Sequence, residues 1–102
     1  MKLLKIVKST SKNKKWTAIF CLCKGETKCC DKERKKIHFG DSRYEDYTQH
    51  KDVDRRKNYR SRHASGKTAK PDSADALSYY ILWGDSTNLN ENINSFKKKY
   101  NL

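Results

Sequence analysis

An apolar run from Trp16 to Cys23 (WTAIFCLC) constrains the fold of this chain more than any other segment. Aromatic and β-branched residues favour an extended backbone, so the run predicts a strand. A weaker pattern from Leu3 to Lys8 predicts a strand before it, and the segment Lys36 to Phe39 predicts one after it. Polar, turn-forming residues separate the three segments, which predicts an antiparallel meander. A sheet of only three strands needs other elements to cover its apolar face.

Two helices predicted near the C-terminus would supply that cover. Asp72 or Ser73 is placed to cap a helix from Ala74 to Trp83, and Gly84 is placed to end it. Asn88 begins an N-x-x-E pattern that resembles a capping box, which predicts a last helix. That helix carries an apolar stripe at intervals of four, three and four residues, which predicts packing on the core. The stripe consists of Leu89, Ile93, Phe96 and Tyr100.

The middle of the chain predicts one more helix between two loops. Asp52 is placed to cap a helix from Val53 to about Arg62. The segment Ser65 to Ser73 contains Gly66 and the chain's one proline, Pro71, so we expect a loop there. Before the helix, residues 41–52 are acidic and aromatic and are also expected to form a loop.

The length of 102 residues leaves room for one domain with a modest core. We expect an α+β fold in which a small three-stranded antiparallel meander is covered by two to three short helices. The single domain 1–102 divides into the meander (1–40), the acidic loop, basic helix and second loop (41–73), and a C-terminal helical pair (74–102). The start, MKLLKIVKST, is too weakly apolar for a signal peptide or a spanning helix, so we expect a soluble, intracellular protein without membrane contact.

The charge balance is the strongest indication of function. Twenty-four Lys and Arg residues stand against twelve Asp and Glu residues, which gives a net charge of +12. Such an excess is relieved by binding something negative. Nucleic acid is the leading candidate, because each phosphate that a basic residue neutralises releases a condensed counterion. DNA is favoured over RNA, although the sequence does not distinguish them.

The best candidate binding residues lie on the predicted middle helix and in the loop after it. Helical spacing places Arg56 and Arg60 on one stripe, and Arg55 and Arg62 on a neighbouring stripe. The planar fork of arginine binds phosphate oxygens in pairs, which predicts contact with the nucleic-acid backbone and no reading of bases. The candidate set is Arg55, Arg56, Lys57, Arg60, Arg62, Lys67 and Lys70.

A second group of lysines at the N-terminus is expected to assist. Strand alternation predicts that Lys2 and Lys8 share one face of the first strand and that Lys5 lies on the other. The group consists of Lys2, Lys5, Lys8, Lys12, Lys14 and Lys15.

Four cysteines lie within ten residues, at Cys21, Cys23, Cys29 and Cys30. Four thiols can bind zinc tetrahedrally, but this C-x-C-x5-C-C spacing lacks the tight C-x2-C turn that zinc sites use. A disulfide requires an oxidising setting. Reduced cysteines are the default expectation, with zinc and disulfide left open, and no metal or cofactor is predicted.

The acidic segment from Tyr44 to Asp52 could indicate a metal-dependent nuclease. Its carboxylates do not follow the spacing of such enzymes, so we expect a structural role and no catalytic residue. In that role Tyr44 and Tyr47 would anchor the loop on the sheet, and the Glu45-Asp46 pair would hold part of the basic helix by ion pairing. Trp83 is expected in the core.

Several long segments resemble a family of small proteins of large nucleocytoplasmic DNA viruses that infect algae and amoebae, a domain of unknown function. The likeness rests on KIHFGDSRYEDYTQHKD (Lys36 to Asp52), RRKNYRSRH (Arg55 to His63) and the helical segment Ala74 to Tyr100. The opening LLKIVKST and KKWTAIF are also similar. The resemblance implies a viral protein, located in the virion or in the viral factory of the host cytoplasm. It implies no enzymatic activity.

We therefore expect a non-enzymatic, basic protein that binds the nucleic-acid backbone, plausibly as a genome accessory packaged in the virion. The alternative is a minor structural protein of the capsid or virion that binds acidic protein surfaces. No small-molecule substrate is predicted, and the sequence does not indicate the oligomeric state.

Overall fold

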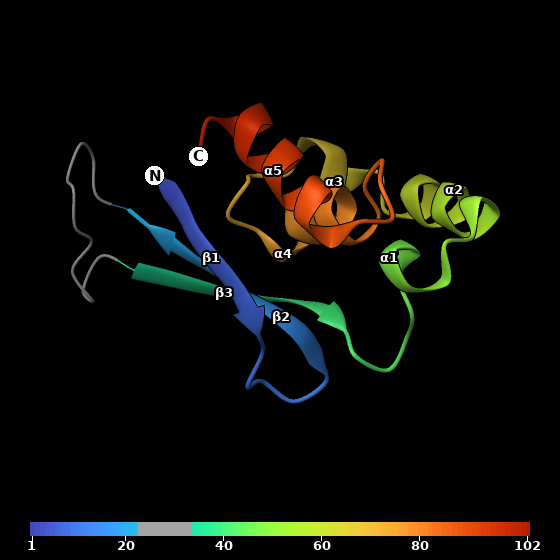
Figure 1. Ribbon diagram of the computed structural model, residues 1–102, viewed down its shortest axis with the longest axis horizontal. Helices are drawn as coiled ribbons and strands as arrows, with labels where there is room; N and C mark the ends of the chain where they lie inside the picture. The colour runs from blue at the N-terminus through green and yellow to red at the C-terminus, as the bar shows by residue number, and fades with distance from the viewer. Residues whose placement is uncertain (23–33) are drawn as a thin grey trace.

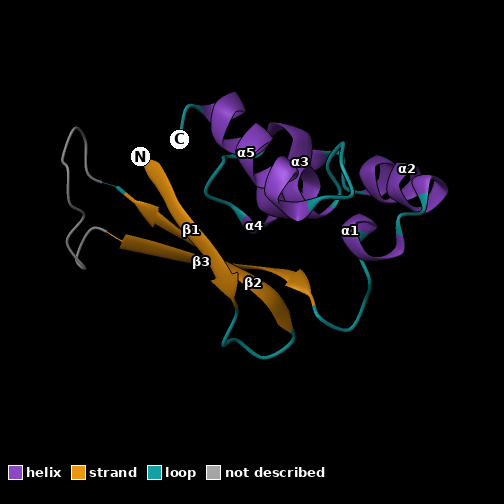
Figure 2. Cartoon of the chain, in the orientation of Figure 1, coloured by secondary structure: helices purple, strands orange, loops and turns teal. Residues whose placement is uncertain are grey.

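The computed structural model describes residues 1–22 and 34–102. Three strands come first in the chain and short helices follow, which is the predicted α+β fold (Figures 1 and 2). The elements are β1 (Lys2–Lys8), β2 (Lys14–Cys21), β3 (Arg34–Asp41), α1 (Tyr47–His50), α2 (Val53–Arg62), α3 (Ser65–Thr68), α4 (Ala74–Leu77), the π-helical turn η2 (Ser78–Leu82) and α5 (Leu89–Tyr100).

The three strands form one antiparallel sheet in the order β1-β2-β3, so the predicted meander is confirmed. The third strand is longer than predicted, because it pairs with β2 from Arg34 to Asp41. The pairing of β1 with β2 shifts by one residue between Leu3 and Lys5. Such a bulge changes the face on which the residues beyond it lie.

The helices lie on one side of the sheet (Figure 1). Their side of the sheet supplies Leu3, Ala18, Phe20 and Phe39 to the core. The helical layer supplies Ala76, Leu77, Ile81, Leu82 and Phe96, all of them buried. The predicted stripe of α5 is confirmed as core packing, since Leu89, Ile93 and Tyr100 pack around the buried Phe96. None of the described helices is long and apolar enough to cross a membrane.

Side-chain caps fix the start of the longer helices, largely as the sequence predicts. The carboxylate of Asp52 accepts hydrogen bonds from the backbone of Asp54 (3.0 Å) and Arg55 (3.2 Å), and α2 has the predicted bounds. Ser73 caps α4 and Asn88 caps α5. The capping box expected at α5 is only half formed, because the Glu91 carboxylate accepts from the Ser86 hydroxyl instead of the Asn88 backbone.

Gly84 is required for a reason other than the one the sequence suggests. It is buried just beyond η2, and a Cβ there would lie 2.2 Å from the carbonyl oxygen of Tyr80. The same Cβ would also lie 2.8 Å from Cγ of the Asn92 side chain of α5. The same amide donates to the carbonyls of Ile81 (2.9 Å) and Ser86 (2.7 Å) and thereby joins α5 to the end of η2. Close approach therefore makes glycine necessary at this position.

Two short helices occupy segments that were expected to be loops. At α1 Asp46 accepts from Thr48 while the side chain of Gln49 accepts from the backbone of Asp46, a complete capping box. At α3 Gly66 is buried against α4, where a Cβ would meet the Asp75 carbonyl oxygen at 2.7 Å. Tyr44 does not anchor the segment, since it is 68% exposed.

Candidate nucleic-acid interface

Two of the five basic side chains of α2 are used to hold the helix against the rest of the protein. Arg56 donates from Nε to the carbonyl of Gly84 and from Nη2 to the carboxylate of Asp85, each at 2.7 Å. Arg60 reaches the same Asp85 oxygen at 3.3 Å. These two guanidinium groups also lie over aromatic rings, with Arg56 5.4 Å from Tyr47 and Arg60 4.3 Å from Tyr79. The predicted stripe exists, and it faces inward.

The other basic side chains of α2 are exposed. Arg55 and Arg62 line one cleft together, as their shared stripe predicts, and Lys57 lies outside it. Of the remaining candidates, Lys67 is on α3 and Lys70 lies just after it, both exposed. The structure therefore divides the predicted binding set over several directions, and binding of nucleic acid by these residues stays a prediction.

Carboxylates surround α2. Asp52 and Asp54 stand at its start, Asp85 pairs with its inner stripe, and Asp75 lines the same cleft as Arg55 and Arg62. The Glu45-Asp46 pair does not hold this helix as expected. Asp46 instead forms an ion pair of 2.7 Å with Lys15 of β2, with both side chains largely buried.

Aromatic side chains join α2 to the helical layer. The ring of Tyr59 is stacked between His63 and Trp83, with centroid distances of 4.2 Å on both sides. Trp83 also packs against the core, as predicted. Burial raises the pKa of Tyr59 above its ordinary value of 10.0. Tyr59 and His63 therefore stack on each other, which leaves neither face of the Tyr59 ring open to a base.

The side of the sheet away from the helices, here called the open face, contains three rows of side chains, and the β2 member of each row is buried. Cross-strand partners share a face, and the register defines the rows across β1, β2 and β3. The rows are Lys2, Cys21 and Arg34; Lys5, Ile19 and Lys36; and Val7, Thr17 and His38. In the third row the Thr17 hydroxyl lies 2.6 Å from Nδ1 of His38. None of these nine residues is acidic.

The lysines of the sheet differ in whether they are neutralised. Lys15, near the start of β2, pairs with Asp46, and Lys35, on the helix side of the sheet, pairs with Asp72 at 2.9 Å. The hydrogen bond from Lys35 lowers the pKa of Asp72 below its ordinary value of 3.8. On the open face, Lys2, Lys5 and Lys36 form no ion pair with any described carboxylate.

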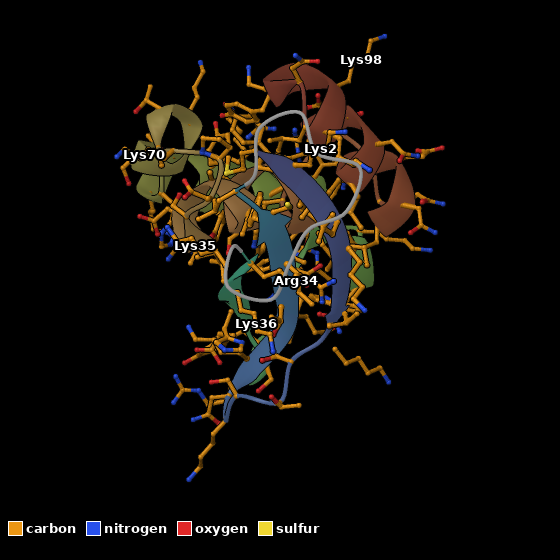
Figure 3. The ribbon with its side chains drawn as sticks, turned by 90° about the vertical axis from the view of Figure 1, so that its left-hand side faces the viewer. Lys2, Arg34, Lys35, Lys36, Lys70 and Lys98 are labelled. Atoms are coloured by element: carbon orange, nitrogen blue, oxygen red, sulfur yellow. The ribbon has the colours of Figure 1, made fainter. Side chains whose placement is uncertain are left out.

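Figure 3 views the molecule from the end of the sheet where β1 begins at Lys2 and β3 begins at Arg34. Lys35, Lys36, Lys70 and Lys98 are also labelled in this view, and the six basic side chains are spread across it.

Sequence reasoning assigned these strand lysines incorrectly. Strict alternation paired Lys2 with Lys8 and put Lys5 on the opposite face. The bulge between Leu3 and Lys5 reverses this, so Lys2 and Lys5 lie together on the open face, while Lys8 pairs with Trp16 on the other side. The sequence alone does not predict that Lys36 lies in the same row as Lys5, because that depends on the register of both β-strand pairs.

Most of the cysteine cluster lies outside the described residues, namely Cys23, Cys29 and Cys30. Cys21 ends β2, where it is buried and disulfide-bonded, so the expectation of a reduced thiol is wrong at this position. Within residues 1–22 and 34–102, no three His, Cys, Asp or Glu side chains are grouped so that they could hold a metal ion.

Comparison with known proteins gives one family. Searches of curated proteins and of solved structures find no match. The profile of a family of unknown function, DUF5754, matches residues 4–63, which run from within β1 to just beyond the end of α2. The matched range ends before the segment Ala74 to Tyr100, in which a resemblance was also expected. Because the match covers more than half of its 102 residues, the chain belongs to this family of unknown function.

Proposed function

We propose that this protein binds the backbone of nucleic acid without catalysing a reaction, and that the open face of the sheet is its principal contact surface. The observation that carries the proposal is that Lys2, Lys5 and Lys36 form no ion pair with any carboxylate of residues 1–22 and 34–102, on a face whose nine residues include no carboxylate. Lysines without an acidic neighbour attract an external polyanion, and binding releases the counterions of both partners.

The geometry of the open face suits phosphates better than bases. Lys5 and Lys36 flank Ile19 from the two outer strands, so their Cα atoms are about 10 Å apart at the usual strand spacing. The nine residues include no Phe, Tyr or Trp on which a base could stack. Binding without stacking or edge contacts is expected to be independent of sequence.

The residues of α2 take a lesser part in this proposal. Arg56 and Arg60 already bind Asp85 and the Gly84 carbonyl, so releasing them would cost contacts within the protein. Lys57, Lys67 and Lys70 are exposed and would add weaker, peripheral attraction. Arg55 and Arg62 face the cleft.

The biological setting we propose is that of a viral genome accessory protein, packaged in the virion or active in the viral factory, with DNA favoured. The resemblance of Lys36 to Asp52 and of Arg55 to His63 to small proteins of large DNA viruses supports this setting. A minor virion protein that binds acidic protein surfaces would use the same basic face, and the experiment below separates the two.

Fluorescence anisotropy with labelled duplex and single-stranded oligonucleotides, between 50 and 200 mM salt, tests the proposal. Three phosphate contacts predict a slope of log K against log salt of about −2.7 on duplex DNA and about −2.1 on a single strand. Affinity should not depend on base sequence. No binding at 50 mM salt, together with capture of an acidic polypeptide such as polyglutamate, would assign the face to protein partners.

A further inference from the structure

We propose that the cleft between α2, the start of β2 and the end of β3 is a nucleotide-binding site, separate from the open face. The cleft has a volume of about 670 Å³, within the range of roughly 300–1,000 Å³ usual for small-ligand sites. The cleft contains none of Lys2, Lys5 and Lys36, so nucleotide binding there can be tested independently of the proposed function. It departs from the expectation that the protein takes no small molecule.

The cleft is lined by equal numbers of cationic and anionic side chains, but some of them are already paired within the protein. Lys15 and Asp46 neutralise each other, and Asp41 is held by two hydrogen bonds from the Arg43 side chain, at 2.8 and 3.0 Å. Arg43 lowers the pKa of Asp41 to about 2, so this carboxylate stays charged and engaged. The charged groups that remain available to a ligand are three cations and two anions. The cations are Lys14, Arg55 and Arg62, and the anions are Glu45 and Asp75.

The cations are arranged for a phosphate. Arg55 and Arg62 are seven residues apart on one face of α2, about 10 Å along the helix axis. Their forks bind phosphate oxygens in pairs. Lys14, at the start of β2, lines the same cleft. No described carboxylate forms an ion pair with any of the three.

The remaining lining suits a planar, polar ring and a sugar. Tyr44 lines the cleft with 68% of its surface exposed. An exposed aromatic ring can stack on a base, as in single-stranded nucleic-acid sites. Asp75 and Glu45 can accept hydrogen bonds from sugar hydroxyls or from amino groups of a base. The ligand class is therefore a nucleoside phosphate.

Two sources share this chemistry, a free mononucleotide and the phosphorylated end of a strand. Isothermal titration of the full chain with adenosine 5′-monophosphate, adenosine and inorganic phosphate measures the first. We expect the monophosphate to bind at least tenfold tighter than either fragment. Equal affinity for the monophosphate and for phosphate alone would overturn the proposal.

Variants locate the site. Arg55→Ala with Arg62→Ala should lower monophosphate affinity at least tenfold, and Tyr44→Ala should lower it without changing affinity for phosphate. Lys57→Ala removes a cation from the same helix outside the cleft and is the matched control. Wild-type affinity in the double variant, with its folded NMR spectrum preserved, would contradict the assignment.

A pair of hexanucleotides, with and without a 5′-phosphate, distinguishes the two sources. Tighter binding of the phosphorylated strand than of the mononucleotide assigns the cleft to strand ends, and the reverse order assigns it to free nucleotide. Indifference to the 5′-phosphate would exclude strand ends as the ligand of the cleft. The variant Lys2→Glu, Lys5→Glu, Lys36→Glu should retain monophosphate binding even where it loses long duplexes, so failure of one site does not mimic failure of the other.

Discussion

The two most basic regions of this protein, α2 and the open face of the sheet, differ in what surrounds their charges. Helix α2 has five basic residues in ten, but Asp52, Asp54, Asp75 and Asp85 stand at its start or against its sides. The open face has fewer charges in sequence, and its nine residues include no acid. The density of arginine and lysine along the sequence therefore does not indicate which of them the fold pairs with carboxylates.

The difference follows from the elements that meet each region. A helix that docks on a protein must satisfy the polar side chains it turns inward, and Arg56 does so with Gly84 and Asp85. None of the described helices packs on the open face, so no such partner is needed there (Figure 1). Two acids that precede helices, Asp46 before α1 and Asp72 before α4, pair instead with Lys15 and Lys35.

The largest effect on stability should come from the covered side of the sheet. Phe20→Ala removes a fully buried ring and is expected to lower the free energy of unfolding by about 3–5 kcal/mol. Lys5→Ala and Lys36→Ala, on the open face, should each change it by less than about 0.5 kcal/mol. Urea denaturation measures all three. A destabilisation from the lysine variants as large as that of Phe20→Ala would show that the open face is part of the structural core.

Replacing an inward arginine of α2 should have an intermediate effect. Arg56→Ala removes the bond to Gly84, the pair with Asp85 and the contact with Tyr47, and should destabilise the protein by about 1–2 kcal/mol. Little of this comes from the ion pair, because Asp85 is 96% exposed and exposed pairs contribute about 0–1 kcal/mol.

Lys57→Ala, the exposed neighbour, is the control and should leave stability within about 0.5 kcal/mol. Affinity for duplex DNA should change less than twofold in both variants. A large loss of DNA affinity in Arg56→Ala, with stability unchanged, would indicate that α2 and not the open face binds DNA.

The smallest effect on stability should come from the ion pair between Lys35 and Asp72. Lys35 holds the pKa of Asp72 below 3.8, so the pair stabilises the folded state above that pH. This contribution is lost as the pH falls through the depressed pKa of Asp72. It should be well under 1 kcal/mol, since Lys35 is half exposed. NMR titration of the Asp72 carboxyl group should show the low pKa, and Lys35→Ala should raise it toward 3.8. An unchanged pKa in the variant would mean that Lys35 is not the cause.

Local signals predicted much of the fold. Asp52 and the residues after it fixed the bounds of α2, and the spacing of Leu89, Ile93, Phe96 and Tyr100 identified the buried side of α5. The helix α1 could also have been predicted, because Asp46 with Gln49 three residues later is a capping pattern.

The candidate site was harder to predict, because it depends on contacts between distant segments. The bulge beyond Leu3 is a property of the pairing with β2, and no residue of β1 alone indicates it. The partner of Arg56 and Arg60 lies 29 and 25 residues away, at Asp85. Simple alternation and helical spacing treat each segment alone, so they could not show which charges would remain unpaired.

The most direct test compares two charge reversals of equal size. One variant carries Lys2→Glu, Lys5→Glu and Lys36→Glu on the open face, and the other carries Lys57→Glu, Arg62→Glu and Lys67→Glu in and around α2. Both lower the net charge by the same amount, so nonspecific attraction falls equally. Anisotropy with duplex DNA at 100 mM salt should show a loss of at least 100-fold for the first variant and less than tenfold for the second. Equal losses, or a greater loss in the second, would contradict the assignment of the open face.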